Sequence, residues 1–164
     1  MTTAVYPGTF DPFTLGHLDV LKRAARLFDS VILAVARSEK KKTLFSLQER
    51  VALVKASCEG LQGLENVTVE GFDGLLCDFA KARGITVSIR GARAVSDFEY
   101  EFQMAGMNRV LMPEVETIFL MPALNCQFVS GSVVREIASL GGDVSDFVPE
   151  PVRCALQQRF PIKK

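Results

Sequence analysis

The chain has 164 residues, and its 19 Lys and Arg balance its 19 Asp and Glu, so the formal net charge is zero. A neutral chain lacks the electrostatic attraction that draws generic nucleic-acid binders and polybasic proteins to nucleic acid or membranes, so we expect neither partner. The longest uninterrupted apolar run, residues 31–36, is far shorter than the about 20 residues of a membrane-spanning helix. With no basic region ahead of an apolar core at the N-terminus, we expect one cytoplasmic domain over residues 1–164.

The cysteines do not form a metal-binding pattern. The chain has four, Cys58, Cys77, Cys126 and Cys154, and one histidine. No two cysteines stand at CxxC spacing, and one histidine cannot complete a usual zinc set. We therefore expect reduced, buried thiols and no protein-bound metal among them.

Short apolar runs rich in β-branched residues alternate along the chain with stretches of helical periodicity. The apolar runs predict strands at residues 3–6, 31–36, 67–69, 85–89 and 117–121. The helical spacing predicts helices at residues 18–28, 47–54, 75–83, from 96 to before Pro113, at 133–140, and from Pro151. Capping boxes at residues 46–49 and 96–99 are typical helix starts, and Gly84 is a typical stop. The alternation predicts an α/β, Rossmann-like fold, a parallel five-stranded sheet with helices on both faces.

Unusual side chains follow four of the predicted strands. In an open parallel sheet ligands bind beyond the carboxyl ends of the strands, so the loops at 8–17, 37–42, 90–93 and 128–132 should converge there. The first loop ends in His17 on the first turn of a helix, where free backbone N–H groups bind phosphate and the helix dipole keeps an imidazole neutral. No Walker A or GxGxxG pattern occurs. The loop therefore predicts a phosphate-binding site that is neither a Walker A loop nor a GxGxxG dinucleotide-binding loop.

Two motifs and one longer segment resemble a known family. Thr14-Leu15-Gly16-His17 resembles the (H/T)xGH signature of the nucleotidyltransferase superfamily, and residues 128–135 resemble its second signature, ISSTxxR. Residues 89–101, with 107–109 and 119–122, resemble bacterial phosphopantetheine adenylyltransferases. That family joins ATP and 4′-phosphopantetheine into dephospho-coenzyme A and pyrophosphate. The resemblance implies an adenylyltransferase of coenzyme A biosynthesis, with ATP, 4′-phosphopantetheine, dephospho-coenzyme A and coenzyme A as ligands.

The resemblance also implies residue roles. As catalytic residues it implies His17, which stabilises the transition state at the ATP α-phosphate, and Lys41, chosen over its lysine neighbours by alignment from Phe45. The implied phosphopantetheine contacts are Thr9, Lys41, Leu76, Arg90 and Asn108. The implied ATP contacts are Thr9, Phe10, His17, Gly91, Ala92, Arg93, Glu101, Cys126, Gln127, Phe128, Val129, Ser130, Gly131 and Ser132.

Two of these positions depart from the family pattern. Gly131 stands where Ser or Thr is usual, so we expect a modest weakening of phosphate binding, and Cys126 stands where an aromatic residue is common near the adenine. The resemblance implies Mg²⁺, and because the sequence offers no dense carboxylate cage, with Asp11 merely the nearest acid, the ion would be held mainly by substrate phosphates and water. It further implies a homohexamer. The helix at 96–111 carries two apolar stripes, of which a monomer would bury one.

Other interpretations of the same residues remain. Taken singly, residues 40–42 suit a solvated loop, Arg90 and Arg93 suit surface ion pairs, and Ser130 and Ser132 suit helix caps. A sister enzyme would transfer AMP or CMP to another phosphate compound, such as nicotinate mononucleotide or glycerol phosphate. A third alternative is a non-catalytic nucleotide-binding module that kept the fold.

Overall fold

The computed structural model describes residues 1–38 and 42–163, apart from the side chains of residues 95 and 96. The described residues form one parallel sheet of five strands in the order β3-β2-β1-β4-β5. The strands are β1 (Thr3–Gly8), β2 (Ser30–Ala36), β3 (Val67–Phe72), β4 (Val87–Gly91) and β5 (Glu116–Leu120). The predicted α/β fold class is confirmed.

Helices connect or follow these strands. They are α1 (Leu15–Leu27), α2 (Leu47–Cys58), α3 (Leu76–Ala82), α4 (Val95–Leu111), the 3₁₀ helix η1 (Leu124–Cys126), α5 (Gly131–Ser139) and α6 (Glu150–Arg159). The capping box of α2 is confirmed, because Ser46 and Glu49 each accept the other's backbone N–H. The short η1 was not predicted.

Several predicted boundaries are wrong; β1 continues to Gly8 rather than ending at residue 6, and β3 continues to Phe72 rather than ending at residue 69. The box at residues 96–99 does not start α4: the helix begins at Val95, its N-cap is Ala94, and no side chain caps it. The Ala92 N–H donates to the Leu120 carbonyl, so the pairing with β5 continues to residue 92. The chain then enters the helix almost directly after it leaves the sheet. Likewise β4 begins at Val87 rather than Ile85, because the Ile85 amide bonds back to the end of α3.

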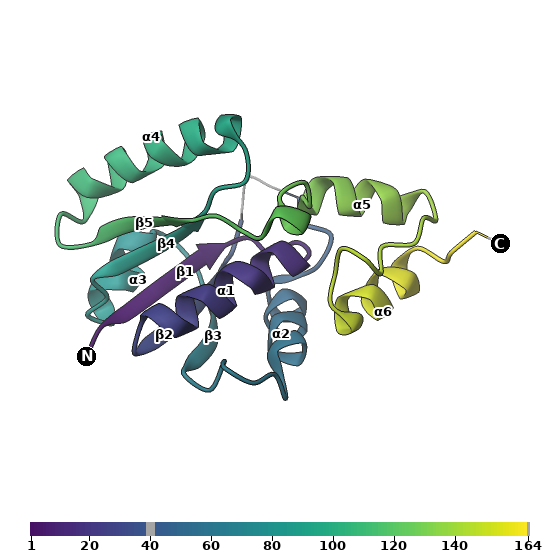
Figure 1. The fold of residues 1–164 in the computed structure, drawn as a ribbon, viewed down its shortest axis with the longest axis horizontal. Coiled ribbons are helices and arrows are strands. Elements are labelled where there is room, and N and C mark those ends of the chain that lie inside the picture. Colours follow the sequence, from purple (N-terminus) through teal and green to yellow (C-terminus); the bar gives the residue numbers. More distant parts are fainter. Residues whose placement is uncertain (39–41, 164) are drawn as a thin grey trace.

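Side chains of the central strands alternate between two buried clusters, one on each face of the sheet. In β2, Val31, Leu33 and Val35 pack with α1 and α2, whereas Ile32 and Ala34 pack with α3. Figure 1 shows α1 and α2 in front of the sheet and α3 behind it, with α5 and α6 beyond the carboxyl ends of the strands. The predicted covering of both faces is therefore confirmed.

The sheet splits at its carboxyl end between β1 and β4. Strand β1 pairs with β2 along its whole length, as far as Gly8, but pairs with β4 only through Ala4 and Val5. This is also the point where the strand order reverses direction, which is where open α/β sheets bind ligands.

Helix α4 lies alongside β5 and buries little of its surface (Figure 1). The expectation that one apolar stripe would be buried within a single chain is wrong, because Phe102 and Met107, one from each stripe, are 64% and 63% exposed. In α4 the Phe98 ring contacts Phe102 of the same helix and Phe119 of β5. In the part of the chain that the structure describes, no helix is both long and apolar enough to cross a membrane.

Candidate active site

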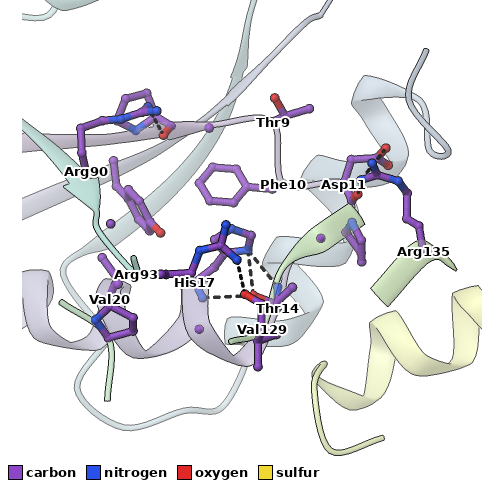
Figure 2. Close-up of a pocket in the computed structure, with 18 of the residues that line it drawn as sticks. Thr9, Phe10, Asp11, Thr14, His17, Val20, Arg90, Arg93, Val129 and Arg135 are labelled. Carbon is purple, nitrogen blue, oxygen red and sulfur yellow. Dashed lines mark hydrogen bonds and ion pairs between the residues drawn. The ribbon is translucent and has the colours of Figure 1, made fainter. Parts of the chain in front are cut away.

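A cavity of about 550 Å³ opens at the split between β1 and β4. Its walls come from the loop after β1, from Lys42 and Thr43 after β2, from the end of β4 and from the start of α5, as Figure 2 shows in part. Of the predicted site residues that the structure describes, nine line it, namely Thr9, Phe10, His17, Arg90, Gly91, Arg93, Glu101, Val129 and Gly131.

Other predicted contacts lie outside the cavity wall. These are Leu76, Ala92, Asn108, Cys126, Gln127, Phe128, Ser130 and Ser132, while Lys41 falls outside the described residues. The hydroxyl of Ser130 accepts the Val133 N–H at 3.2 Å and so caps α5. Leu76 packs against the cluster on the α3 face of the sheet. The roles of all these residues as ligand contacts stay predictions.

The orientation of His17 is fixed by Thr14, the N-cap of α1. His17 Nδ1 lies 3.0 Å from the Thr14 backbone nitrogen, which donates to it, and the Thr14 hydroxyl accepts the His17 N–H. Because a backbone N–H can only donate, Nδ1 is the unprotonated nitrogen and Nε2 carries the proton. Nε2 bonds no described residue and is available to a ligand. We did not predict this cap, although Thr-x-x-His has capping-box spacing with His in place of Glu.

The His17 imidazole is neutral at pH 7. Its pKa is lowered to about 3, chiefly because the ring is removed from water and also because of the nearby positive charges of Arg93 and Arg90. The ring stacks on Phe13 and meets Phe10 edge-on, with centroids 5.8 and 5.0 Å away. We expected a neutral imidazole from the helix dipole; the structure adds burial as the largest cause.

Phe10 supports His17 from a backbone conformation that L residues rarely adopt. Its φ is +50°, and its side chain is 4% exposed. Its ring lies over Gly8, where an added Cβ would stand 2.9 Å from the ring. Gly8 therefore gives the Phe10 ring the room to pack against His17.

Arg90 spans the split between the strands. It donates to both carboxylate oxygens of Glu101, at 2.6 and 2.8 Å, and to the Pro7 carbonyl at 3.0 Å. Burial alone would lower the pKa of Arg90, but the hydrogen bonds and charge of Glu101 raise it above its ordinary value. The ion-pair interpretation of Arg90 is thus correct, but the pair lies in the cavity wall rather than on an open surface.

Positive charge dominates the described lining of the cavity. Lys42, Arg90, Arg93 and Arg135 line it, against Asp11 and Glu101. Arg93 is held by the Val129 carbonyl at 2.5 Å and by Asp97 at 3.3 Å. A pocket with this balance suits a ligand with several phosphates.

The carboxylates of the cavity are already engaged. Asp11 accepts backbone N–H groups from Leu44 and Phe45, and Glu101 accepts from Arg90. Among the described residues no group of three or more His, Cys, Asp or Glu side chains could hold a metal. Mg²⁺ bound chiefly by phosphate oxygens and water fits this lining, because the ion readily keeps several waters.

Several lining residues had no role in our sequence analysis. Arg135 stood in the second signature without a role; it donates to the Asp11 backbone carbonyl. Tyr6 is 4% exposed and has no hydrogen bond to a described residue, and burial raises the pKa of its hydroxyl. In the sequence, Tyr6 looks like an ordinary buried strand residue. That it faces a cavity follows from the split between β1 and β4, which the sequence does not reveal.

Comparison with known proteins agrees with this geometry. Residues 5–137 match the family model described as cytidylyltransferase-like. The chain is 60% identical over 158 residues to the phosphopantetheine adenylyltransferase of Methylococcus capsulatus, covering 96% of each chain. It is 53% identical to that of Hahella chejuensis over the full length of both.

Solved structures of low sequence identity share the fold. A Plasmodium falciparum nicotinic acid mononucleotide adenylyltransferase superposes with a TM-score of 0.70 at 14% identity, covering 97% of this chain and 95% of that one. A bifunctional NMN adenylyltransferase/ADP ribose pyrophosphatase from Francisella tularensis gives 0.74 at 15% identity, covering 96% of this chain and 49% of that one. The sequence relatives go further than the fold: the chain belongs to the cytidylyltransferase-like family and, within it, to the phosphopantetheine adenylyltransferases, which are nucleotidyltransferases.

Proposed function

We propose that this chain transfers AMP from ATP to the phosphate of 4′-phosphopantetheine, giving dephospho-coenzyme A and pyrophosphate. The observation that carries the proposal is the neutral His17, whose Nε2–H is available in a cavity lined by cations. The curated relatives that share 53–60% of its residues bear the name of this activity.

The reaction requires positioning and charge stabilisation more than proton removal. The acceptor phosphate is already anionic, so its oxygen attacks the α-phosphorus directly while the bond to the bridging oxygen of the pyrophosphate breaks. Negative charge grows on the α-phosphoryl oxygens as the transition state forms. A fixed, neutral N–H donor such as His17 Nε2 stabilises that charge without reorganisation. This explains why the described cavity needs no free carboxylate base.

The surrounding groups would hold the two substrates in line. Thr9 lies in the loop that leads to His17, and the free N–H groups at the start of α5, at Gly131, suit the β- and γ-phosphates. Arg93 adds charge on the same side, held by Val129. We assign the acceptor phosphate to Lys41, which stays a prediction from the resemblance; its neighbour Lys42 lines the cavity.

Mg²⁺ would supply further positive charge at the phosphates when it is bound with ATP. We propose that substrate phosphates and water hold it, because the Asp11 and Glu101 oxygens already accept protein hydrogen bonds. The chain's own contribution is the positive charge that Arg90, Arg93 and Lys42 bring to the cavity lining.

We also propose a homohexamer in the cytoplasm. The exposed apolar side chains of α4, among them Phe102 and Met107, form a surface larger than scattered single residues and suit a contact between copies. Sedimentation of the purified chain tests this: a mass of six chains is expected, and a mass near 18.0 kDa at micromolar concentration contradicts it.

The activity itself is tested by pyrophosphate release from ATP and Mg²⁺ with each of two acceptors. Release with 4′-phosphopantetheine and none with nicotinate mononucleotide is the expected result. Release only with nicotinate mononucleotide would show that the proposed acceptor is wrong but that the chain still transfers AMP from ATP to a phosphate group. ATP binding without release from either acceptor would indicate a non-catalytic nucleotide-binding protein.

A further inference from the structure

Asp11 joins two loops that are far apart in the sequence. It is 7% exposed and lies in the loop after β1. One carboxylate oxygen accepts the Leu44 N–H at 2.8 Å, and the other accepts the Phe45 N–H at 3.0 Å. Both amides belong to the loop after β2, whose residues Lys42 and Thr43 line the cavity. A buried carboxylate thus ties one wall of the cavity to the loop that carries Thr9 and Phe10.

Arg50 strengthens the same junction from α2. It is 2% exposed, and its guanidinium donates to three backbone carbonyls, those of Thr9 at 2.7 Å, Ala36 at 2.9 Å and Phe45 at 3.1 Å. These carbonyls belong to the loop after β1, the end of β2 and the loop after β2. Burial lowers the pKa of Arg50, and the charge of Asp11 opposes that change.

Arg135 brings a third element to the junction. It extends from α5 toward Asp11, as Figure 2 shows, and its Nη1 donates to the Asp11 carbonyl and lies 3.8 Å from the carboxylate. Gly131, at the start of α5, lines the cavity. Three elements that present groups to the cavity therefore meet at one buried residue, the loop after β2 through the Asp11 carboxylate and α5 mainly through the Asp11 backbone carbonyl.

We propose that Asp11 is a positioning residue for the adenylyl transfer, holding the loop after β1, the loop after β2 and the start of α5 at fixed separations around the phosphates. The inference rests on the proposed function for the identity of the reaction. It assigns Asp11 neither to the metal nor to proton transfer, because both carboxylate oxygens already accept backbone N–H groups. Small displacements of reacting groups are costly, since about 1 Å can reduce the rate about 10²-fold.

The test uses the full-length Asp11→Asn protein. The amide keeps the size of the side chain, but only its oxygen can accept, so its NH₂ faces one of the two backbone N–H groups. Losing one charge-assisted hydrogen bond should speed hydrogen exchange at Leu44 and Phe45 by about 10- to 100-fold. We expect kcat/KM for both substrates to fall by about 10-fold or more, with no change in the Mg²⁺ concentration for half-maximal activity.

Asp29→Asn is the matched control. Asp29 also joins distant segments by accepting a backbone N–H, from Thr2 at 2.7 Å, but it directly precedes β2, at the amino ends of the strands and away from the cavity. It should leave kcat/KM and the exchange of the Leu44 and Phe45 amides as in the wild type. If Asp11→Asn does not fold, Arg135→Gln at its half-exposed position serves instead, and a severalfold fall in kcat/KM is expected.

Three outcomes would overturn the proposal. One is wild-type exchange and kinetics in Asp11→Asn, or, if that protein does not fold, wild-type kcat/KM in Arg135→Gln. Another is wild-type amide exchange with a raised Mg²⁺ requirement, which would make Asp11 a metal ligand. The third is faster exchange with unchanged kcat/KM, which would make Asp11 purely structural. The exchange data do not depend on activity, so an inactive wild type would contradict the proposed function separately.

Discussion

Replacing Gly8 by Ala tests whether the packing of Phe10 holds His17 in place. The new Cβ would stand 2.9, 3.0 and 3.2 Å from three atoms of the Phe10 ring. Carbon atoms pack comfortably at about 3.5–4.0 Å, so the ring must move by roughly 0.5–1 Å. Tyr6, Phe13 and His17 pack around it with ring centroids 5.0–5.8 Å away, so a shift of the Phe10 ring changes its contact with His17.

Overpacking of this size costs about 1–3 kcal/mol of unfolding free energy, which lowers Tm by about 2–12 °C in a chain of this length. A comparable shift of His17 should reduce turnover by about 10- to 100-fold. Calorimetry and steady-state pyrophosphate release measure the two effects. Gly106→Ala is the control, because its Cβ would meet no atom within 4 Å and should not lower Tm. Wild-type Tm and turnover in Gly8→Ala would refute the packing argument.

Three further changes have defined outcomes. Gly131→Ser should fold normally, since its Cβ would lie 3.4 Å from the Asp11 carbonyl oxygen. Calorimetry should show about fivefold tighter ATP binding, because the new hydroxyl adds one hydrogen bond of about 1 kcal/mol. Weaker binding would show that the hydroxyl has no room. Ser88→Ala should raise the unfolding free energy by about 1 kcal/mol in urea titrations, because the buried Ser88 hydroxyl has no described partner, and a loss of stability would contradict this. The pKa of His17 is about 3 in the folded chain and 6.5 ordinarily, so the unfolded chain binds more protons between these values. The His17 contribution to the unfolding free energy is therefore complete above pH 6.5 and is lost as pH falls toward 3, with a slope of at most about 1.4 kcal/mol per pH unit. His17→Asn should lack this slope. Equal slopes for the two proteins in urea unfolding at pH 4.5–6.5 would contradict a neutral imidazole in the folded chain.

The sequence predicts the strands and their parallel arrangement because buried parallel strands have their own signature. The run at 31–36 is apolar at every position, and β2 indeed buries side chains on both faces. Helix boundaries were predicted less well where the sheet constrains the chain. The start of α4 depends on the bond between Ala92 and Leu120, two residues that are distant in sequence.

The candidate site, too, could be predicted from the sequence only in part. His17 could be predicted because it is the one histidine, in a glycine-containing loop after a strand. Its tautomer could not, because it depends on the 3.0 Å contact with the Thr14 amide. Asp11 and Arg50 read as ordinary polar residues, since the partners that join the two loops, Leu44 and Phe45 for Asp11 and Thr9 for Arg50, lie 33 to 41 positions away in the chain. Such long-range hydrogen bonds to backbone atoms leave no pattern in side-chain spacing.

The central claim is that a neutral His17 stabilises the transition state of adenylyl transfer. A rapid-quench single turnover with limiting ATP, saturating 4′-phosphopantetheine and Mg²⁺ tests it most directly, comparing the wild type with His17→Asn. The account predicts dephospho-coenzyme A and pyrophosphate in equal amounts, formed about 10²–10³-fold more slowly by the variant while its ATP binding changes little. Product formation by the variant at the wild-type rate would contradict the assigned role of His17.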